Sequence, residues 1–431
     1  MQKQPIIIVG AGIAGLIAAK ELIEKYDVLV LEASDRIGGR ISTLRADGFS
    51  THIEAGAEFI HGHLKETIHL LKEAGIDYEE VEGKMYRKEN GKFKEENEMI
   101  EGWDDLLKKM ESLEQDMTMH DFLQQYFSEN KYADLRKQAI AYAEGFDVAD
   151  VKQASVCSLY NEWSQEENTN YRIPTGYGSL IDFLTAECER EGVRIITNET
   201  VKQIDWETND VTIYTNSTTD DERQTAVENK YSAEKIIITV PISVLQSVGA
   251  KAAINFTPAL DEYINAARQI GFGNVIKVLL QFKEPFWQKD AGFIFSDEAI
   301  PTWWTQLPDD VALLTGWVGG SKAECLNDNT ENEIAEKALQ SLANIFDLTL
   351  NKLKDNLIAS KIVNWQKDEY AMGAYSYATP QTTAAINVLN NPVNATIYFC
   401  GEALYEGTSP GTVEAAIVHA KQVAQKIIGS F

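Results

Sequence analysis

The sequence predicts an α/β protein (α+β overall) in which one domain is assembled from separated segments of the chain. Three observations support this prediction. The N-terminal residues indicate strand, glycine turn, helix and strand, and the C-terminal residues indicate a strand and a long helix. Between them, the pattern becomes helical at 63–170 and then returns to alternating helices and strands. Because the chain has 431 residues, two or three domains are expected rather than one core.

The N-terminal unit is a βαβ motif. An apolar run at 5–9 precedes GAGIAGLIAAKELIEKY, and DVLVLEAS follows it. Gly10, Gly12 and Gly15 form GxGxxG: the first glycine allows a tight turn, the second admits a pyrophosphate, and the third lets helix and strand pack closely. The helix N-terminus attracts phosphates, and Glu32 ends the second strand, where a carboxylate can bind ribose hydroxyls. The unit predicts a dinucleotide site.

The next residues extend this site. LEASDRIGGRIST carries two arginines, Arg36 and Arg40, and the paired glycines Gly38 and Gly39. The glycines let the backbone approach a ligand, and the arginines can pair with pyrophosphate, Arg40 being the better placed. An ordinary turn is the less favoured explanation of the glycines, because they follow a βαβ unit. From these residues alone, the dinucleotide is either NAD or FAD.

Further elements follow along the chain. Residues 63–170 show helical periodicity and many acids, and are predicted to form a helical insertion. Beyond it we predict a helix after 174, strands near 193–197 and 210–215, a loop or hairpin tip at 216–230 and a buried strand in AEKIIITVP. A second sheet region starts at 271–282 and continues through GFIFSD and VALLTGWVGG. A helix at 330–350, a strand in NATIYFCGE and a long terminal helix in GTVEAAIVHAKQVAQKII complete the chain.

One strand contains an unexpected lysine. Alternation places its side chains on two faces: Ile276, Val278, Leu280 and Phe282 on one, and Val275, Lys277, Leu279 and Gln281 on the other. Because lysines are seldom fully buried, this pattern alone favours a sheet with one wet face and Lys277 in water.

Charge and composition narrow the class of protein. The chain has 66 acidic and 39 basic residues, a net charge of −27. Such a surface repels nucleic acids and anionic membranes, and attracts cationic substrates, although a generic acidic surface explains it too. No apolar run is long enough for a membrane span, and no signal peptide precedes the first strand, so we expect a cytoplasmic protein.

Cysteine and histidine usage gives no sign of a metal. Cys157, Cys188, Cys325 and Cys400 lie far apart, as expected of reduced thiols. His61-Gly-His63 lacks the HExxH pattern and has no supporting cysteine, so no metal site is predicted.

A family resemblance joins these signals. LEASDRIGGR after a GxGxxG unit resembles the flavin-dependent amine oxidase superfamily, which includes monoamine oxidases, polyamine oxidases and flavin histone demethylases. Seven further motifs occur in the order of that family and span nearly the whole chain: GAEFIHG (56–62), GYGSL (176–180), VPISVL (240–245), GFGNVIKV (271–278), PFW (285–287), WQKDEYAMGAYSY (365–377) and GEALYEGTSPGTVEAA (401–416).

The resemblance implies a particular domain organisation. A Rossmann-like FAD-binding domain of residues 1–62, 176–248 and 393–431 would be interleaved with a substrate-binding domain of residues 63–175 and 249–392. In the second domain, a six-stranded mixed β-sheet flanked by helices would carry the insertion 63–175.

The resemblance also implies how FAD is held. Val201 would meet the adenine side through its backbone, Glu402 the ribityl chain, and Val413 the flavin pyrimidine through its N–H. Monoamine oxidases carry a cysteine where this chain has Ala374, so non-covalent FAD is expected. The full set of implied cofactor-binding residues is Gly10, Gly12, Ala14, Gly15, Glu32, Ala33, Gly39, Arg40, Gly56, Ala57, Glu58, Val201, Trp365, Gly401, Glu402, Thr412 and Val413.

Catalytic and substrate-lining residues follow from the same resemblance. Lys277 would lie beneath the flavin and hold a water against N5, Tyr375 would form one aromatic wall, and His61 would line a substrate tunnel. Thr412 replaces the second cage tyrosine of monoamine oxidases, so the two-tyrosine cage is absent. The implied substrate-lining residues are Phe59, Trp365, Tyr377 and Thr412.

The expected activity is oxidation of a small cationic amine, a polyamine first of all, to an imine, with O2 reduced to H2O2. A monoamine or L-amino acid oxidase is the alternative. The latter needs an arginine for the substrate carboxylate, Arg172 and Arg268 being the candidates. Histone demethylation is disfavoured because no chromatin-reading domain or long coiled-coil insertion is visible. A flavin-binding protein without turnover is a further alternative, and the oligomeric state is not predicted.

Overall fold

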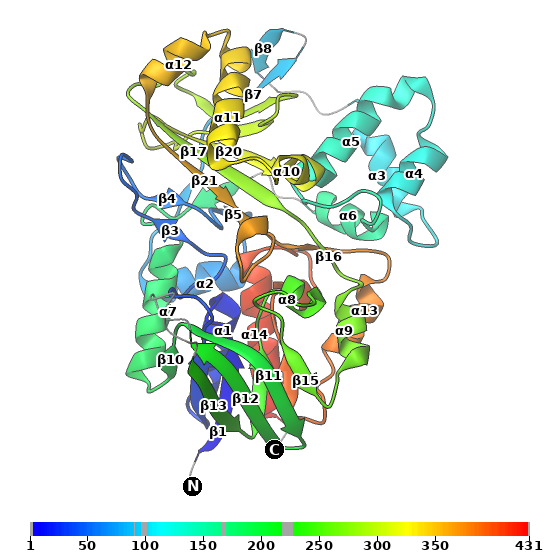
Figure 1. The fold of residues 1–431 in the computed structure, drawn as a ribbon. Helices are drawn as coiled ribbons and strands as arrows, with labels where there is room; N and C mark the ends of the chain where they lie inside the picture. The colour runs from blue at the N-terminus through cyan, green and yellow to red at the C-terminus, as the bar shows by residue number, and fades with distance from the viewer. Residues whose placement is uncertain (1–2, 90, 96–100, 166–168, 218–226, 430–431) are drawn as a thin grey trace.

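The computed structural model describes residues 3–89, 91–95, 101–165, 169–217 and 227–429, and the elements below are those of these residues. A nucleotide-binding half, which contains both chain termini, and a half built on a large mixed sheet lie one above the other in Figure 1. A group of helices projects beside the second half. The predicted α/β class, with two interleaved domains, is confirmed.

The nucleotide-binding half is built on a parallel sheet. Its strands occur in the order β10 (Arg194–Ile196), β2 (Tyr26–Leu31), β1 (Gln4–Val9), β14 (Lys235–Ile238) and β23 (Ile397–Phe399). Ile6 and Ile8 belong to one apolar cluster and Ile7 and Val9 to another. Both faces are therefore buried, which explains the uninterrupted apolar run in this strand.

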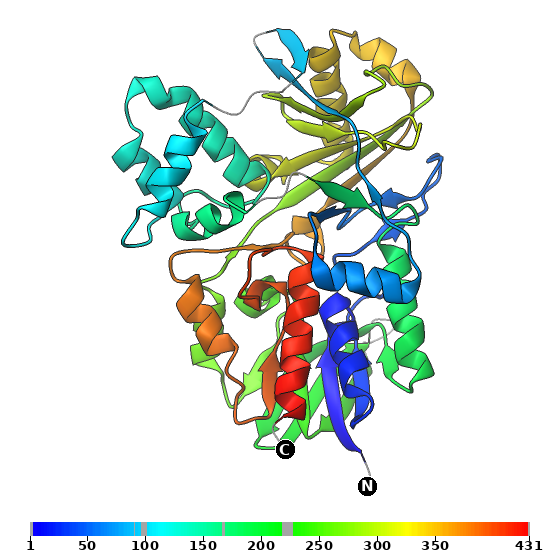
Figure 2. The ribbon, with the colours of Figure 1, turned by 180° about the vertical axis from the view of Figure 1, so that it is seen from behind.

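Helices cover one face of this sheet and a second sheet covers the other. The helices are α1 (Ile13–Leu22), α7 (Gly178–Arg190) and α14 (Val413–Ile428), seen side by side in Figure 2, and α2 (Lys65–Ala74), which lies across their upper ends in that view. The second sheet contains β13 (Val227–Ala233), β12 (Asp210–Ser217), β11 (Glu199–Glu207) and β15 (Asn255–Thr257). Beside it lie α8 (Ile242–Gln246), α9 (Asp261–Ala267) and α13 (Thr382–Leu389). The short helix η3 (Glu402–Leu404) contributes Ala403 and Leu404 to the apolar cluster of Ile7 and Val9.

The other half is built on a seven-stranded mixed sheet. Its strands are β21 (Leu357–Asn364), β17 (Val275–Phe282), β20 (Leu313–Gly319), β19 (Thr302–Trp304), β18 (Ala291–Ser296), β7 (Lys84–Glu89) and β8 (Lys92–Glu95). Its helices are α10 (Gly320–Leu326), α11 (Glu331–Phe346) and α12 (Leu350–Asn356). Apolar side chains of the last two pack on one face of the sheet.

Short elements complete the chain. Three small sheets pair β3 (Thr43–Leu44) with β4 (Ile53–Glu54), β16 (Gly271–Phe272) with β22 (Ser376–Tyr377), and β5 (Phe59–His61) and β6 (Glu79–Glu80) with β9 (Asn170–Arg172). The projecting helices are α3 (Trp103–Glu111), α4 (Met119–Tyr126), η1 (Asn130–Tyr132), α5 (Ala133–Gly145) and α6 (Val156–Trp163). The short helix η2 (Trp365–Lys367) follows β21.

Two sequence-based expectations are corrected. The segment 63–170 is not helical throughout, because β7 and β8 form an antiparallel hairpin that extends the large sheet. This makes seven strands where six were expected. The signal was the dipeptide Asn90-Gly91, typical of a hairpin turn, between two short alternating segments. The tip predicted at 216–230 falls partly on 218–226, outside the described residues; β12 and β13 flank it as an antiparallel pair.

Packing also differs from the predicted domain boundaries. Helix α2 lies within the predicted insertion, yet its Leu70 and Leu71 belong to the core of the parallel sheet. Helices α9 and α13 lie within the predicted substrate domain, yet they pack on the other face of that sheet. Each helix presents an apolar stripe that is buried against the nearest sheet, irrespective of its place in the sequence.

Among the described residues, no helix is both long and apolar enough to cross a membrane. No group of three or more His, Cys, Asp and Glu side chains in this part of the chain could hold a metal ion. The four cysteines are free thiols.

Candidate active site

A single cavity of about 1550 Å³ joins the glycine turn after β1 to the large sheet and the projecting helices. It exceeds the usual size of a site for one small ligand, so it has room for a dinucleotide and a second molecule. With the exception of Gly15, all the predicted site residues line it: Gly10, Gly12, Ala14, Glu32, Ala33, Gly39, Arg40, Gly56, Ala57, Glu58, Phe59, His61, Val201, Lys277, Trp365, Tyr375, Tyr377, Gly401, Glu402, Thr412 and Val413.

The glycine turn has the geometry that its spacing predicts. Gly10 has φ +107°, which favours glycine. A Cβ on Gly15 would lie 2.0 Å from the carbonyl oxygen of Gly10, so this glycine permits the packing of helix on strand. A Cβ on Gly12 would meet nothing within 4 Å, because this glycine faces the open cavity. At the end of β2, Glu32 accepts hydrogen bonds from the backbone N–H groups of Ala11 (2.7 Å) and Ser34 (2.9 Å).

Arg40 and Glu402, both implied cofactor ligands, bind each other. Arg40 Nη1 donates to Glu402 Oε1 and to the carbonyl of Ala374, each at 2.8 Å. The hydroxyl of Ser376 donates to the second oxygen of Glu402 at 2.6 Å. This ion pair ties the loop after β2 to the loop after β23, across the cavity wall.

The N-terminus of α14 opens on the cavity at Val413, as the sequence predicted for the start of the terminal helix. Thr412 is the N-cap, and its hydroxyl accepts from the N–H of Ala415. Glu414 is buried and accepts from the N–H groups of Glu66 and Thr67 and from the Thr67 hydroxyl, thereby capping α2. Sequence reasoning missed this carboxylate because its partners are nearly 350 residues away.

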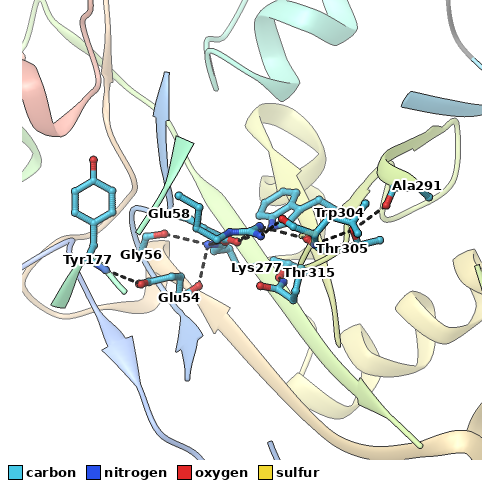
Figure 3. A network of polar contacts seen from close by, with 12 residues as sticks. Glu54, Gly56, Glu58, Tyr177, Lys277, Ala291, Trp304, Thr305 and Thr315 are labelled. Carbon is cyan, nitrogen blue, oxygen red and sulfur yellow. Dashed lines mark hydrogen bonds and ion pairs between the residues drawn. The ribbon is translucent and has the colours of Figure 1, made fainter. Parts of the chain in front are cut away.

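Lys277 is buried, with 1% of its surface exposed (Figure 3). Its ammonium donates to the carbonyls of Glu54 (2.8 Å) and Gly56 (3.0 Å) and to Glu58 Oε2 (2.8 Å). The expectation of a wet sheet face is therefore wrong, because the chain from β4 to β5 packs over this side of β17. The location at the cavity wall agrees with the resemblance.

Glu58 is the acidic centre of the same network. Its other oxygen accepts from Arg172 Nη2 (3.0 Å) and Trp304 Nε1 (2.8 Å). Burial alone would raise the pKa of Glu58, but the charges of Lys277 and Arg172 outweigh it and hold that pKa below its usual range. Burial, and then the charge of Glu58, raise the pKa of the neighbouring Glu54 to about 7.

The two arginines considered for a substrate carboxylate lie elsewhere. Arg172 binds Glu58 and the carbonyls of Leu307 and Thr305 behind the cavity wall. Arg268 is exposed at the end of α9. Neither side chain lines the cavity.

Aromatic rings form the wall next to Lys277. Phe59 packs edge-on against Trp304, with ring centroids 5.3 Å apart, and tilts against Phe293. The Trp304 ring also lies over the Lys277 ammonium, 5.4 Å from its centroid. Sequence reasoning missed Trp304, Trp317, Phe146 and Phe293, although two adjacent tryptophans at 303–304 were a signal for an aromatic wall.

Three further predicted side chains are fixed by hydrogen bonds. His61 Nδ1 pairs with Asn170 Oδ1 at 2.7 Å, and burial lowers the pKa of His61. Tyr375 donates its hydroxyl to the carbonyl of Phe146. The Trp365 indole donates to the carbonyl of Ala55 at 2.9 Å. Tyr377 also lines the cavity and packs against the core of the projecting helices.

Comparison with known proteins shows the family to which the chain belongs. The family model described as flavin containing amine oxidoreductase matches residues 13–428. Relatives include Lysine-specific histone demethylase 1 homolog 3 of Arabidopsis thaliana (24% identical over 99% of this chain and 30% of that protein). They also include Protein anon-37Cs of Drosophila lebanonensis (26%, 99% and 88%) and human Lysine-specific histone demethylase 2 (25%, 98% and 53%). The chain thus spans about half or less of the demethylases.

Solved structures share the whole fold. Cyclohexylamine oxidase from Brevibacterium oxydans IH-35A superposes with a TM-score of 0.81 at 20% identity, over 99% of both chains. Putrescine oxidase bound to putrescine gives 0.79 at 20% identity, again over 99% of both chains.

Because the family match covers nearly its whole length, the chain belongs to the flavin-containing amine oxidoreductase family. Membership in this family implies a flavin cofactor.

Proposed function

We propose that the protein is an FAD-dependent amine oxidase that holds FAD non-covalently and oxidises a cationic amine, a polyamine being the leading candidate. O2 would be the electron acceptor and H2O2 a product. The observation that carries the proposal is the continuity of one cavity from the glycine turn to the aromatic wall and Lys277. A cytoplasmic location stays a prediction.

The residues present fit FAD. Gly12 leaves a space that any Cβ would enter, Glu32 offers a carboxylate beside it, and the N-terminus of α14 opens on the cavity at Val413. Non-covalent binding is supported by Ala374 and by the absence of cysteine among the described residues that line the cavity. Heat or acid precipitation should release the yellow colour into the supernatant; colour retained in the pellet would contradict non-covalent binding.

Flavin, when bound, supplies a two-electron acceptor for the hydride that leaves the carbon next to the amine nitrogen. The chain must then exclude water, orient this C–H bond and favour the neutral amine. Phe59, Trp304 and Tyr375 supply apolar walls for the first two tasks. With Asn170 Oδ1 as acceptor, the His61 proton sits on Nδ1, and Nε2 keeps a lone pair that can take a proton from an ammonium. The lowered pKa keeps this histidine neutral.

A positively charged substrate is supported by the net charge of −27 on the protein, which favours the approach of cations. A monoamine remains an alternative. An L-amino acid is less favoured, since neither Arg172 nor Arg268 lines the cavity. A methylated lysine is a second candidate because several relatives carry the name of lysine-specific histone demethylases. A flavin-binding protein without turnover would not need the buried Lys277.

An amine panel tests the proposal. The protein is mixed without oxygen with spermine, spermidine, N-acetylated polyamines, putrescine, a monoamine, an L-amino acid or a methyl-lysine peptide, while the flavin absorbance is followed. We expect bleaching by at least one polyamine, and peroxide in air. Bleaching by another amine alone would replace the substrate, and no bleaching by any amine would refute amine oxidation.

A further inference from the structure

All three N–H donors of the Lys277 ammonium are used by the protein. Two meet the backbone carbonyls of Glu54 and Gly56, and the third meets the carboxylate of Glu58. The lysine borders the cavity, yet its hydrogen bonds are directed to the segment between β4 and β5. In this arrangement no N–H remains to hold a water in the cavity.

Glu58 is the partner whose loss would free one N–H of the Lys277 ammonium. The two backbone carbonyls are fixed by the path of the chain, whereas the third acceptor is a side chain. That carboxylate is itself held firmly, because β5 and β9 pair Phe59 with Arg172 and bring the guanidinium beside Glu58. Arg172 is held in turn by the carbonyls of Leu307 and Thr305.

The charges of Lys277, Arg172 and Glu58 do not cancel. Two cations, Lys277 and Arg172, share the single carboxylate of Glu58, which is 6% exposed. Without that carboxylate, two buried positive charges would face each other, and Lys277 would have one N–H without an acceptor. A freed ammonium at the wall of so large a cavity would turn toward the water or ligand within it to regain a partner.

We propose that Glu58 is a positioning residue that acts through Lys277. Its carboxylate takes the third hydrogen bond of the ammonium and keeps this cation directed away from the cavity, which limits the positive field on a flavin bound there. A cation directed into the cavity would favour the reduced, more negative flavin. The inference rests on the proposed flavin site and does not depend on which amine is oxidised.

A double-mutant cycle tests it through the midpoint potential of the bound flavin. Glu58→Gln is made in the parent and in Lys277→Met, and each holoprotein is titrated with a redox dye in the absence of amine. The charge of Glu58 itself acts equally in both backgrounds, so only an effect through Lys277 makes the shifts differ. We expect Glu58→Gln to raise the reduced-to-oxidised ratio at least tenfold more in the parent, about 30 mV for two electrons.

Glu54→Gln is the matched control. It removes a buried carboxyl from the same cluster, but Lys277 contacts only the backbone of Glu54. At pH 6 a carboxyl with a pKa of about 7 is mainly neutral, so this variant should give equal shifts in both backgrounds. Equal shifts for Glu58→Gln would overturn the proposal.

Glu58→Asp is the substitute variant if Glu58→Gln does not fold or does not hold flavin. It keeps the charge, but the carboxylate is one methylene further from the ammonium. We expect a smaller shift in the same direction, again dependent on Lys277; a potential equal to the parent's would overturn the proposal. Because no amine is present, failure here is distinguishable from failure to oxidise amines.

Discussion

At the scale of single residues, the first test concerns Lys277, the only lysine on β17. We predict that Lys277→Met keeps FAD but slows flavin reoxidation or amine oxidation at least about tenfold, which is about 1.4 kcal/mol of barrier. A cation near the flavin stabilises the charge that develops as electrons pass to O2. The variant should fold, since Glu58 keeps Arg172 and Trp304 as partners.

Both half-reactions of the Lys277 variant are measured by stopped-flow absorbance. Lys361→Met is the control, because Lys361 lies on the adjacent strand β21 and does not line the cavity. If the Lys277 variant reduces and reoxidises at parental rates, the lysine has only a structural role.

Tyr375 tests the aromatic wall. Tyr375→Phe removes only the hydroxyl, which is bound to the carbonyl of Phe146, so kcat/KM should stay within about threefold of the parent. Tyr375→Leu removes the ring and should lower kcat/KM at least about tenfold, because the wall no longer orients the amine. Steady-state peroxide assays give both values; equal losses in the two variants would assign the role to the hydroxyl instead.

At the scale of elements, two glycines of the turn between β1 and α1 have different roles: Gly12 leaves space for a ligand, and Gly15 permits the packing of helix on strand. Gly12→Ala adds a methyl group where nothing lies within 4 Å, so the flavin-free protein should unfold at the parental midpoint. The same methyl enters the cavity and should weaken FAD binding at least about tenfold, about 1.4 kcal/mol.

Gly15→Ala is the matched variant, since its methyl would lie 2.0 Å from the Gly10 carbonyl. It should lower the free energy of unfolding by about 1–3 kcal/mol even without FAD. Chemical denaturation and flavin fluorescence measure both effects. Identical behaviour of the two variants would contradict the division of roles.

Elements with local constraints could be predicted from the sequence. The GxGxxG turn and the start of α14 are set by nearby residues, and both were located correctly. The burial of Lys277 could not be derived from strand alternation, because its acceptors lie about 220 residues away. The Arg172–Glu58 pair likewise depends on the pairing of β5 with β9. The family resemblance located Lys277 at the cavity but did not reveal its saturated hydrogen bonds.

At the scale of the whole molecule, stability should depend on His419, which joins α14 to the loop after β23. Its Nδ1 accepts from the N–H of Gly401, and Nε2 pairs with Asn390. Burial, and then the charge of Lys426, lower the pKa of His419 from 6.5 to about 4. Below pH 6.5, His419 therefore binds a proton in the unfolded chain but not in the folded chain. The free energy of unfolding falls for this reason as the pH drops from 6.5 to 4.

His419→Asn keeps an acceptor near Gly401 and removes the titration. Between pH 7 and pH 5, the parent should lose about 2 kcal/mol of unfolding free energy more than the variant does. Urea denaturation at both pH values measures the difference. Parallel losses would show that His419 does not titrate in this window.

The net charge of −27 acts on the whole molecule and leads to a prediction about salt. A cation approaching this acidic surface is attracted over a distance that shrinks from about 30 Å at 0.01 M salt to about 8 Å at 0.15 M. For spermine, which carries several charges, kcat/KM should fall several-fold to about tenfold over this range. A monoamine with a single charge should show a clearly smaller fall. Since both amines meet the same cavity, a salt effect on flavin binding or on folding would lower both values equally. Equal falls, or none, would show that the acidic surface does not steer the substrate.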